Sequence, residues 1–163
     1  QTKENIENSP WKDRVRAKVI SIQEFASSID EKFDLIVSNP PYFINSLKNS
    51  SANKTTARHT DFLTHEELMT GAKKILADNG RICLILPVNE GEKCMQFSES
   101  IGLHCHKTVY VHPKPAVEAK RVLLQFGFAP ITTEVTELDI ETSERHQYSK
   151  ELTALAKDFY LKL

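Results

Sequence analysis

Residues 33–43 read Phe33-Asp34-Leu35-Ile36-Val37-Ser38-Asn39-Pro40-Pro41-Tyr42-Phe43. The apolar first half is typical of a strand buried on both faces, as in a parallel sheet. The two prolines end this strand, because neither can donate a hydrogen bond to a sheet ladder. Open α/β sheets bind their ligands at the carboxyl ends of their strands. The residues that follow Ser38 are therefore candidates for a functional site.

The groups in residues 39–42 favour the binding of a planar amine. An exocyclic amine such as that of adenine has two N–H donors and a lone pair delocalised into the ring. We expect the Asn39 side-chain oxygen to accept one N–H and the Pro40 carbonyl to accept the other, which points the lone pair at a methyl donor. We expect Tyr42 to stack on the base, a contact worth about 1–3 kcal/mol. The alternative is that these residues form only a turn, with Tyr42 covering the edge of the core.

The composition predicts one globular domain over residues 1–163, because the chain is long enough for a core and 40% of it is hydrophobic. The formal net charge is −1, so nucleic-acid binding requires a local basic patch. The three cysteines form no CxxC pair, so we expect no metal site and a reducing, cytoplasmic environment. The longest apolar run, residues 82–88, is too short to span a membrane.

Strand and helix patterns alternate along the chain. Thr64 and Glu67 form a capping box that begins a helix, and we expect Asn79-Gly80 to end it. Helices are also expected at 23–29, at 92–101 and after Ser149, the last with an apolar stripe that includes Leu155 and Phe159 and packs into the core. Strands are expected at 15–20, 33–38, 81–86, 104–112 and 120–128. This order predicts an α/β doubly wound sheet that ends in an antiparallel strand pair.

Four segments together resemble one methyltransferase family. They are residues 33–43, Ala57-Arg58-His59-Thr60-Asp61, Lys120-Arg121-Val122-Leu123-Leu124-Gln125-Phe126, and Lys157-Asp158-Phe159-Tyr160-Leu161-Lys162-Leu163. The chain resembles the bacterial tRNA1(Val) (adenine(37)-N6)-methyltransferases, which are class I S-adenosylmethionine-dependent enzymes. The resemblance implies a Rossmann-like sheet with helices on both faces, S-adenosylmethionine as cofactor, tRNA as partner, and an anticodon-loop adenine as target.

The resemblance also implies roles for single residues. Asn39, Pro40 and Tyr42 would be catalytic, with Asn39 also bordering the cofactor. Tyr42 would stack on a base flipped out of the tRNA. The substrate would be contacted by Pro41, Phe43, Arg58, His59, Lys114, Lys120 and Arg121. For the charged residues among these, the alternatives are a solvated loop and a sheet edge protected by lysines.

The Gly-rich loop that holds the cofactor in this family has no counterpart in the sequence. The five glycines, Gly71, Gly80, Gly91, Gly102 and Gly127, lie too far apart to form one. The resemblance places that loop before Asn39, so we expect it, and the first strands of the sheet, upstream of Gln1. The chain would then be the carboxyl-terminal portion of a longer enzyme and carry the target-base half of its site. The alternatives are an N-methyltransferase acting on rRNA, DNA or release-factor glutamine, and an inactive fragment.

Overall fold

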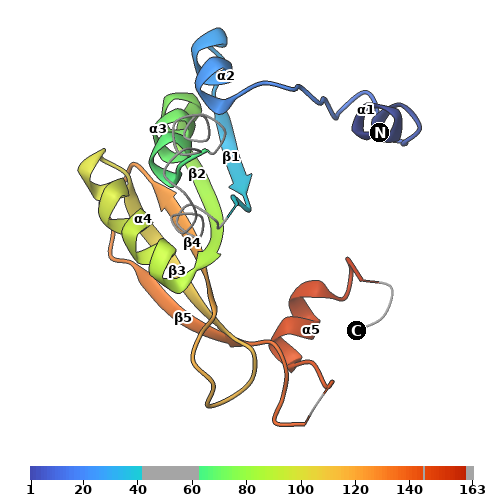
Figure 1. Ribbon diagram of the computed structural model, residues 1–163, viewed down its shortest axis with the longest axis vertical. Coiled ribbons are helices and arrows are strands. Elements are labelled where there is room, and N and C mark those ends of the chain that lie inside the picture. Colours follow the sequence, from blue (N-terminus) through green and yellow to red (C-terminus); the bar gives the residue numbers. More distant parts are fainter. Residues whose placement is uncertain (42–62, 145, 161–163) are drawn as a thin grey trace, which may run out of the picture.

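The computed structural model describes residues 1–41, 63–144 and 146–160. In these residues a sheet is formed by β1 (Phe33–Ser38), β2 (Leu76–Pro87), β3 (His104–His112), β4 (Arg121–Gly127) and β5 (Glu134–Asp139), in the order β1-β2-β4-β3-β5 (Figure 1). The helices are α1 (Thr2–Glu7), α2 (Ile22–Ser28), α3 (His65–Ile75), α4 (Val88–Ser100) and α5 (Lys150–Ala156). The α/β class predicted from the sequence is confirmed.

The strand directions bring several strand ends together at one edge of the sheet. β1 pairs parallel with β2, and β3 pairs parallel with β5. β4 runs antiparallel to both β2 and β3, which confirms the predicted antiparallel pair. The carboxyl ends of β1, β2, β3 and β5 therefore lie at the same edge as the start of β4. This edge, called the carboxyl edge below, includes the turn after β1 and the β3–β4 loop (Figure 1).

The core lies between the sheet and the two helices α3 and α4. Leu84 of β2 and Leu124 of β4 are neighbours in register, and both are buried. Met69 and Ala72 of α3 are completely buried in the same cluster. A Cβ on Gly91 of α4 would clash with Val122, so this glycine lets α4 lie directly on β4. The two helices thus pack closely against this face of the sheet and cover it.

The opposite face of the sheet is open at β1. Leu35 is 56% exposed and Val37 is 70% exposed, so the prediction that this strand is buried on both faces is wrong for the described chain. A hollow of about 430 Å³ lies on this face. Its lining comes from all four strands β1 to β4 and comprises Val37, Ser38, Asn39, Cys83, Leu84, Ile85, Lys107, Val109, Leu123, Leu124 and Gln125.

Two element boundaries differ from the sequence-based expectation. Residues 15–20 form no strand, and Val19 is fully exposed. A strand needs a neighbouring strand for its backbone hydrogen bonds, and none of the described strands pairs with residues 15–20. The helix expected to end at Asn79-Gly80 ends at Ile75, because Leu76 is extended and already pairs with Phe33.

The final helix also differs from its predicted packing. Ser149 caps α5 as expected, donating from Oγ to the Asp139 carbonyl and accepting from the Leu152 N–H. Its apolar stripe was expected in the core, but Leu155 is 66% exposed and Phe159 is 85% exposed. The stripe prediction is therefore wrong within the described residues.

Candidate active site

The turn after β1 places two acceptors at the carboxyl edge. Asn39 follows the last residue of β1 and is exposed, whereas Pro40 is buried. Asn39 also lines the hollow on the open face of the sheet. Pro41 is exposed and is the last described residue before the gap at 42–62. The structure thus brings Asn39, Pro40 and Pro41 to the sheet edge where the sequence predicted them.

Four of the predicted site residues lie outside the described residues. They are Tyr42, Phe43, Arg58 and His59. The roles that the sequence suggests for them stay predictions.

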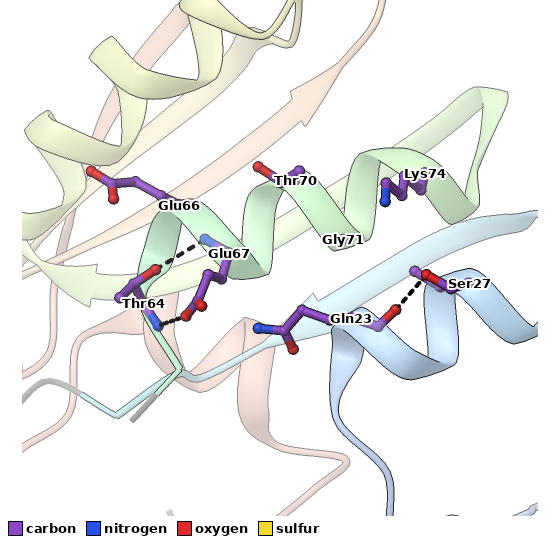
Figure 2. Close-up of a pocket in the computed structure, with 9 residues that line it drawn as sticks. Gln23, Ser27, Thr64, Glu66, Glu67, Thr70, Gly71 and Lys74 are labelled. Atoms are coloured by element: carbon purple, nitrogen blue, oxygen red, sulfur yellow. Dashed lines mark hydrogen bonds between the residues drawn. The ribbon is translucent and has the colours of Figure 1, made fainter. Parts of the chain in front are cut away.

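The described chain resumes at residue 63 with a well-defined helix start. The Glu67 N–H donates to Thr64 Oγ1 at 3.1 Å, and the Thr64 N–H donates to Glu67 Oε2 at 2.9 Å (Figure 2). This is the capping box predicted from the sequence. His65, the first residue of α3, is half-buried, and burial lowers the pKa of its imidazole.

Three of the basic residues predicted to contact substrate lie on the loop between β3 and β4 or at the start of β4. Lys114 and Lys120 are exposed, and Arg121 is partly buried at the start of β4. Since β4 begins at the carboxyl edge, these residues share that edge with Asn39. The charge of the loop is mixed, because exposed Glu118 lies between the two lysines in sequence.

The same loop is held in one conformation by the strand ends. The His112 ring donates from Nδ1 to the Val117 carbonyl at 2.7 Å. The Lys120 N–H donates to the Val111 carbonyl at 3.0 Å. Ala116 has a φ of 60°, a left-handed conformation that is unfavourable for a residue with a Cβ. The loop therefore presents its lysines from a constrained backbone.

The described glycines do not form a cofactor-binding loop. An added Cβ on Gly71, Gly80, Gly91 or Gly127 would meet a neighbouring atom at 2.8 Å or less, so close packing accounts for each of them. Gly102 has a φ of +74° and ends α4. The described glycines thus supply no Gly-rich loop of the kind that holds a cofactor.

The three cysteines are poor candidates for nucleophiles. Cys83, Cys94 and Cys105 are free thiols. Burial raises the pKa of all three, and that of Cys94 to about 12. The thiolate is the reactive form, so a raised pKa disfavours nucleophilic chemistry by these side chains at neutral pH.

A groove of about 480 Å³ between α2 and α3 is a second concavity (Figure 2). Some of its polar groups are engaged with one another. Thr64 and Glu67 form the capping box, and the Ser27 hydroxyl donates to the Gln23 carbonyl at 2.8 Å. We assign no chemistry to this groove.

Neither a metal-binding cluster nor a membrane-spanning helix occurs among the described residues. No group of three His, Cys, Asp or Glu side chains there is arranged to hold a metal ion. None of the described helices has the length and apolar character needed to cross a membrane.

Comparison with known proteins identifies the family. The Eco57I restriction-modification methylase family model matches residues 1–112. A protein from Trichodesmium erythraeum is 38% identical over 162 residues, covering 99% of this chain and 67% of its own length. A protein from Parabacteroides distasonis is 40% identical over 164 residues, covering 100% of this chain and 69% of its own length. Both are named tRNA1(Val) (adenine(37)-N6)-methyltransferase.

Solved structures show the same fold. A predicted O-methyltransferase from Agrobacterium tumefaciens superposes with a TM-score of 0.56 at 20% identity, over 88% of this chain and 58% of that one. A chain of a type I restriction-modification system superposes with a TM-score of 0.50 at 17% identity, over 86% of this chain and 32% of that one. The structural likeness shows the fold, and the close sequence relatives show the family. The chain belongs to the tRNA1(Val) (adenine(37)-N6)-methyltransferase family.

Proposed function

We propose that this protein takes part in S-adenosylmethionine-dependent methylation of adenine 37, at N6, in tRNA1(Val), and that its Asn39-Pro40 turn holds the target amine. The observation that carries the proposal is the place of this turn. An exposed amide and a proline carbonyl follow directly on β1 at the carboxyl edge of the sheet. The names of the relatives supply the substrate.

The two acceptors match what the target amine offers. Asn39 Oδ1 accepts one N–H of the adenine amine, and the Pro40 carbonyl accepts the other. S-adenosylmethionine supplies an electrophilic methyl group when bound, so no strong base is needed. The work of the chain is therefore to hold and orient the amine, which is catalysis by positioning and electrostatics.

The remaining residues surround the base and the nucleic acid in this proposal. Tyr42 stacks on the flipped adenine, and Pro41 and Phe43 line its pocket. The phosphate backbone is contacted by Arg58, His59, Lys114, Lys120 and Arg121. The support for Lys114, Lys120 and Arg121 is their place at the carboxyl edge, and that for the others is sequence position alone.

The substrate is tested with the full-length enzyme and labelled S-adenosylmethionine. We expect label on a tRNA1(Val) transcript with adenine at position 37 and none on a transcript with guanine there, which lacks the N6 amine. Nuclease digestion and mass spectrometry should identify N6-methyladenosine. Equal labelling of both transcripts, or labelling only of rRNA, DNA or release factor, would contradict the proposal.

A further inference from the structure

The β3–β4 loop contains a tight turn with an unfavourable residue at its third position. The turn spans residues 114–117, and the Val117 N–H donates to the Lys114 carbonyl at 3.2 Å. Pro115 has the fixed φ that suits the second position of a type II turn. The third position of such a turn needs a positive φ, which glycine adopts most readily, but here Ala116 adopts it, with a φ of 60°. A contact from outside the turn is therefore needed to stabilise this conformation.

His112 makes a contact with the last residue of this turn. Its ring nitrogen Nδ1 lies 2.7 Å from the Val117 carbonyl oxygen, and because that oxygen can only accept, Nδ1 carries the proton. The other ring nitrogen, Nε2, is buried and has no hydrogen-bond partner among the described residues. The hydrogen bond that joins the ring to the loop is thus the one at Nδ1.

The backbone that leads into the turn is fixed as well. The His112 carbonyl accepts from the Ile140 N–H at 2.9 Å, and the Pro113 carbonyl accepts from the Glu141 N–H at 3.0 Å. Residues 140 and 141 directly follow β5, which pairs with β3 (Figure 1). Lys114 therefore extends from a backbone that is hydrogen-bonded both at the preceding carbonyl and at its own.

This fixed backbone bears on what the charge of Lys114 can reach. Glu141 and Glu144 line the same hollow of about 370 Å³ as Lys114. Lys114 is exposed, and within the described part of the chain no ion pair joins it to either carboxylate. A fixed backbone limits the positions that the ammonium group can take, so it keeps this cation available to a phosphate.

We propose that His112 is a positioning residue for tRNA binding: its hydrogen bond from Nδ1 to the Val117 carbonyl holds the 114–117 turn and so presents Lys114 to a tRNA phosphate. The inference rests on the proposed function, in which Lys114 contacts the phosphate backbone. A cation that is held in place before binding loses less conformational freedom when tRNA binds, and this raises the affinity. His112 itself contacts no tRNA and takes no part in methyl transfer.

Three substitutions of His112 in the full-length enzyme separate the two ring nitrogens. His112→Ala removes both, His112→Asn keeps an amide N–H near the position of Nδ1, and His112→Gln places one near the position of Nε2. His106→Ala is the matched control, because His106 Nε2 lies 2.8 Å from the Ala129 carbonyl oxygen, near the opposite end of β3. Steady-state methylation of tRNA1(Val) gives kcat and KM, titration gives the tRNA affinity, and thermal unfolding checks that each variant is folded.

We expect His112→Ala to raise KM for tRNA and to weaken tRNA affinity by about 3–10-fold with kcat nearly unchanged, as when a long side chain must be ordered on binding. His112→Asn should restore most of the affinity, His112→Gln should not, and His106→Ala should match the wild type. If His112→Ala does not fold, the comparison of His112→Asn with His112→Gln decides.

A double-substitution cycle tests whether His112 acts through Lys114. Lys114→Ala alone should weaken tRNA binding. In that background, His112→Ala should cause little further loss, because the cation that His112 positions is already absent. Fully additive losses would overturn the inference, as would an unchanged affinity in Lys114→Ala.

The inference would also be overturned by wild-type tRNA affinity in folded His112→Ala, or by a His112→Gln enzyme that binds tRNA as tightly as His112→Asn. These outcomes leave the methyl-transfer reaction intact. The proposed function fails separately if the wild-type enzyme does not methylate tRNA1(Val).

Discussion

Asn39 and Pro40 are neighbours in sequence, yet the first is exposed and the second is buried. The burial of Pro40 anchors the backbone, and the exposure of Asn39 presents its amide at the carboxyl edge. A residue of fixed φ at the anchored position limits the directions in which the adjacent amide can point. This division of roles suits a site that works by positioning.

The lowered pKa of His65 predicts how the stability of the protein depends on pH. Because burial holds its pKa in the folded protein below the usual value of 6.5, the unfolded chain binds the proton more tightly. Its stabilising effect is therefore fully present above pH 6.5 and is lost as pH falls through 6.5 toward the lower, folded pKa. Thermal unfolding of the wild type and His65→Asn between pH 5 and 8 should show the wild type losing more stability at acid pH. Parallel curves would contradict this.

The proposed contact of Lys114 with the tRNA backbone predicts a change in the salt dependence of binding. If it contacts a phosphate, Lys114→Ala should weaken binding and reduce the slope of log K against log salt by about 1. Exposed Lys3 in α1 is the matched control, and Lys3→Ala should leave the slope as it is. Filter binding or fluorescence titration over a range of salt concentrations gives both slopes. An unchanged slope in Lys114→Ala would remove this residue from the interface.

At the scale of elements, the sequence predicts features that depend on neighbouring residues. It does not predict those that depend on strand pairing between distant parts of the chain. The start of α3 is predictable because a capping box involves only four consecutive residues, Thr64 to Glu67. Its end was misplaced, because Leu76 leaves the helix to pair with Phe33, more than forty positions earlier in the chain. No residue pattern at Leu76 itself indicates that the helix ends there and a strand begins.

The capping box should matter for stability. Thr64→Ala removes the acceptor for the Glu67 N–H and should cost about 1 kcal/mol of unfolding free energy. Ser100→Ala is the control, because the Ser100 hydroxyl only donates to the Phe97 carbonyl at an exposed helix end, so we expect a change below about 0.5 kcal/mol. Urea unfolding measures both. Equal costs for the two variants would show that the capping box adds nothing.

At the scale of the whole molecule, the sequence predicted the class of the fold and the placement of Asn39 and Pro40 at the carboxyl end of β1. It did not predict the parallel pairing of β5 with β3, nor the open face at Leu35 and Val37. An apolar strand sequence does not say which of its faces a given chain covers, because that depends on segments far away. The exposed Phe159 stripe was misjudged for the same reason.

The two faces of the sheet should respond differently to substitution in the 163-residue chain. Leu84→Ala on the core face should cost about 2–5 kcal/mol of unfolding free energy, since it leaves a cavity under α3 and α4. Val37→Lys on the open face should change it by less than about 0.5 kcal/mol and reduce the binding of an apolar dye. A large loss of stability in Val37→Lys would show that this face is covered.

The central claim is that Asn39 orients the target amine without being needed to hold the tRNA. The most direct test is single-turnover methylation of tRNA1(Val) by full-length Asn39→Ala, with tRNA affinity measured in parallel and Asp34→Ala, an exposed change at the other end of β1, as control. The account predicts a rate lower by about 100–1,000-fold or more, nearly unchanged affinity, and a normal rate for the control. A near-normal methylation rate in Asn39→Ala would contradict it.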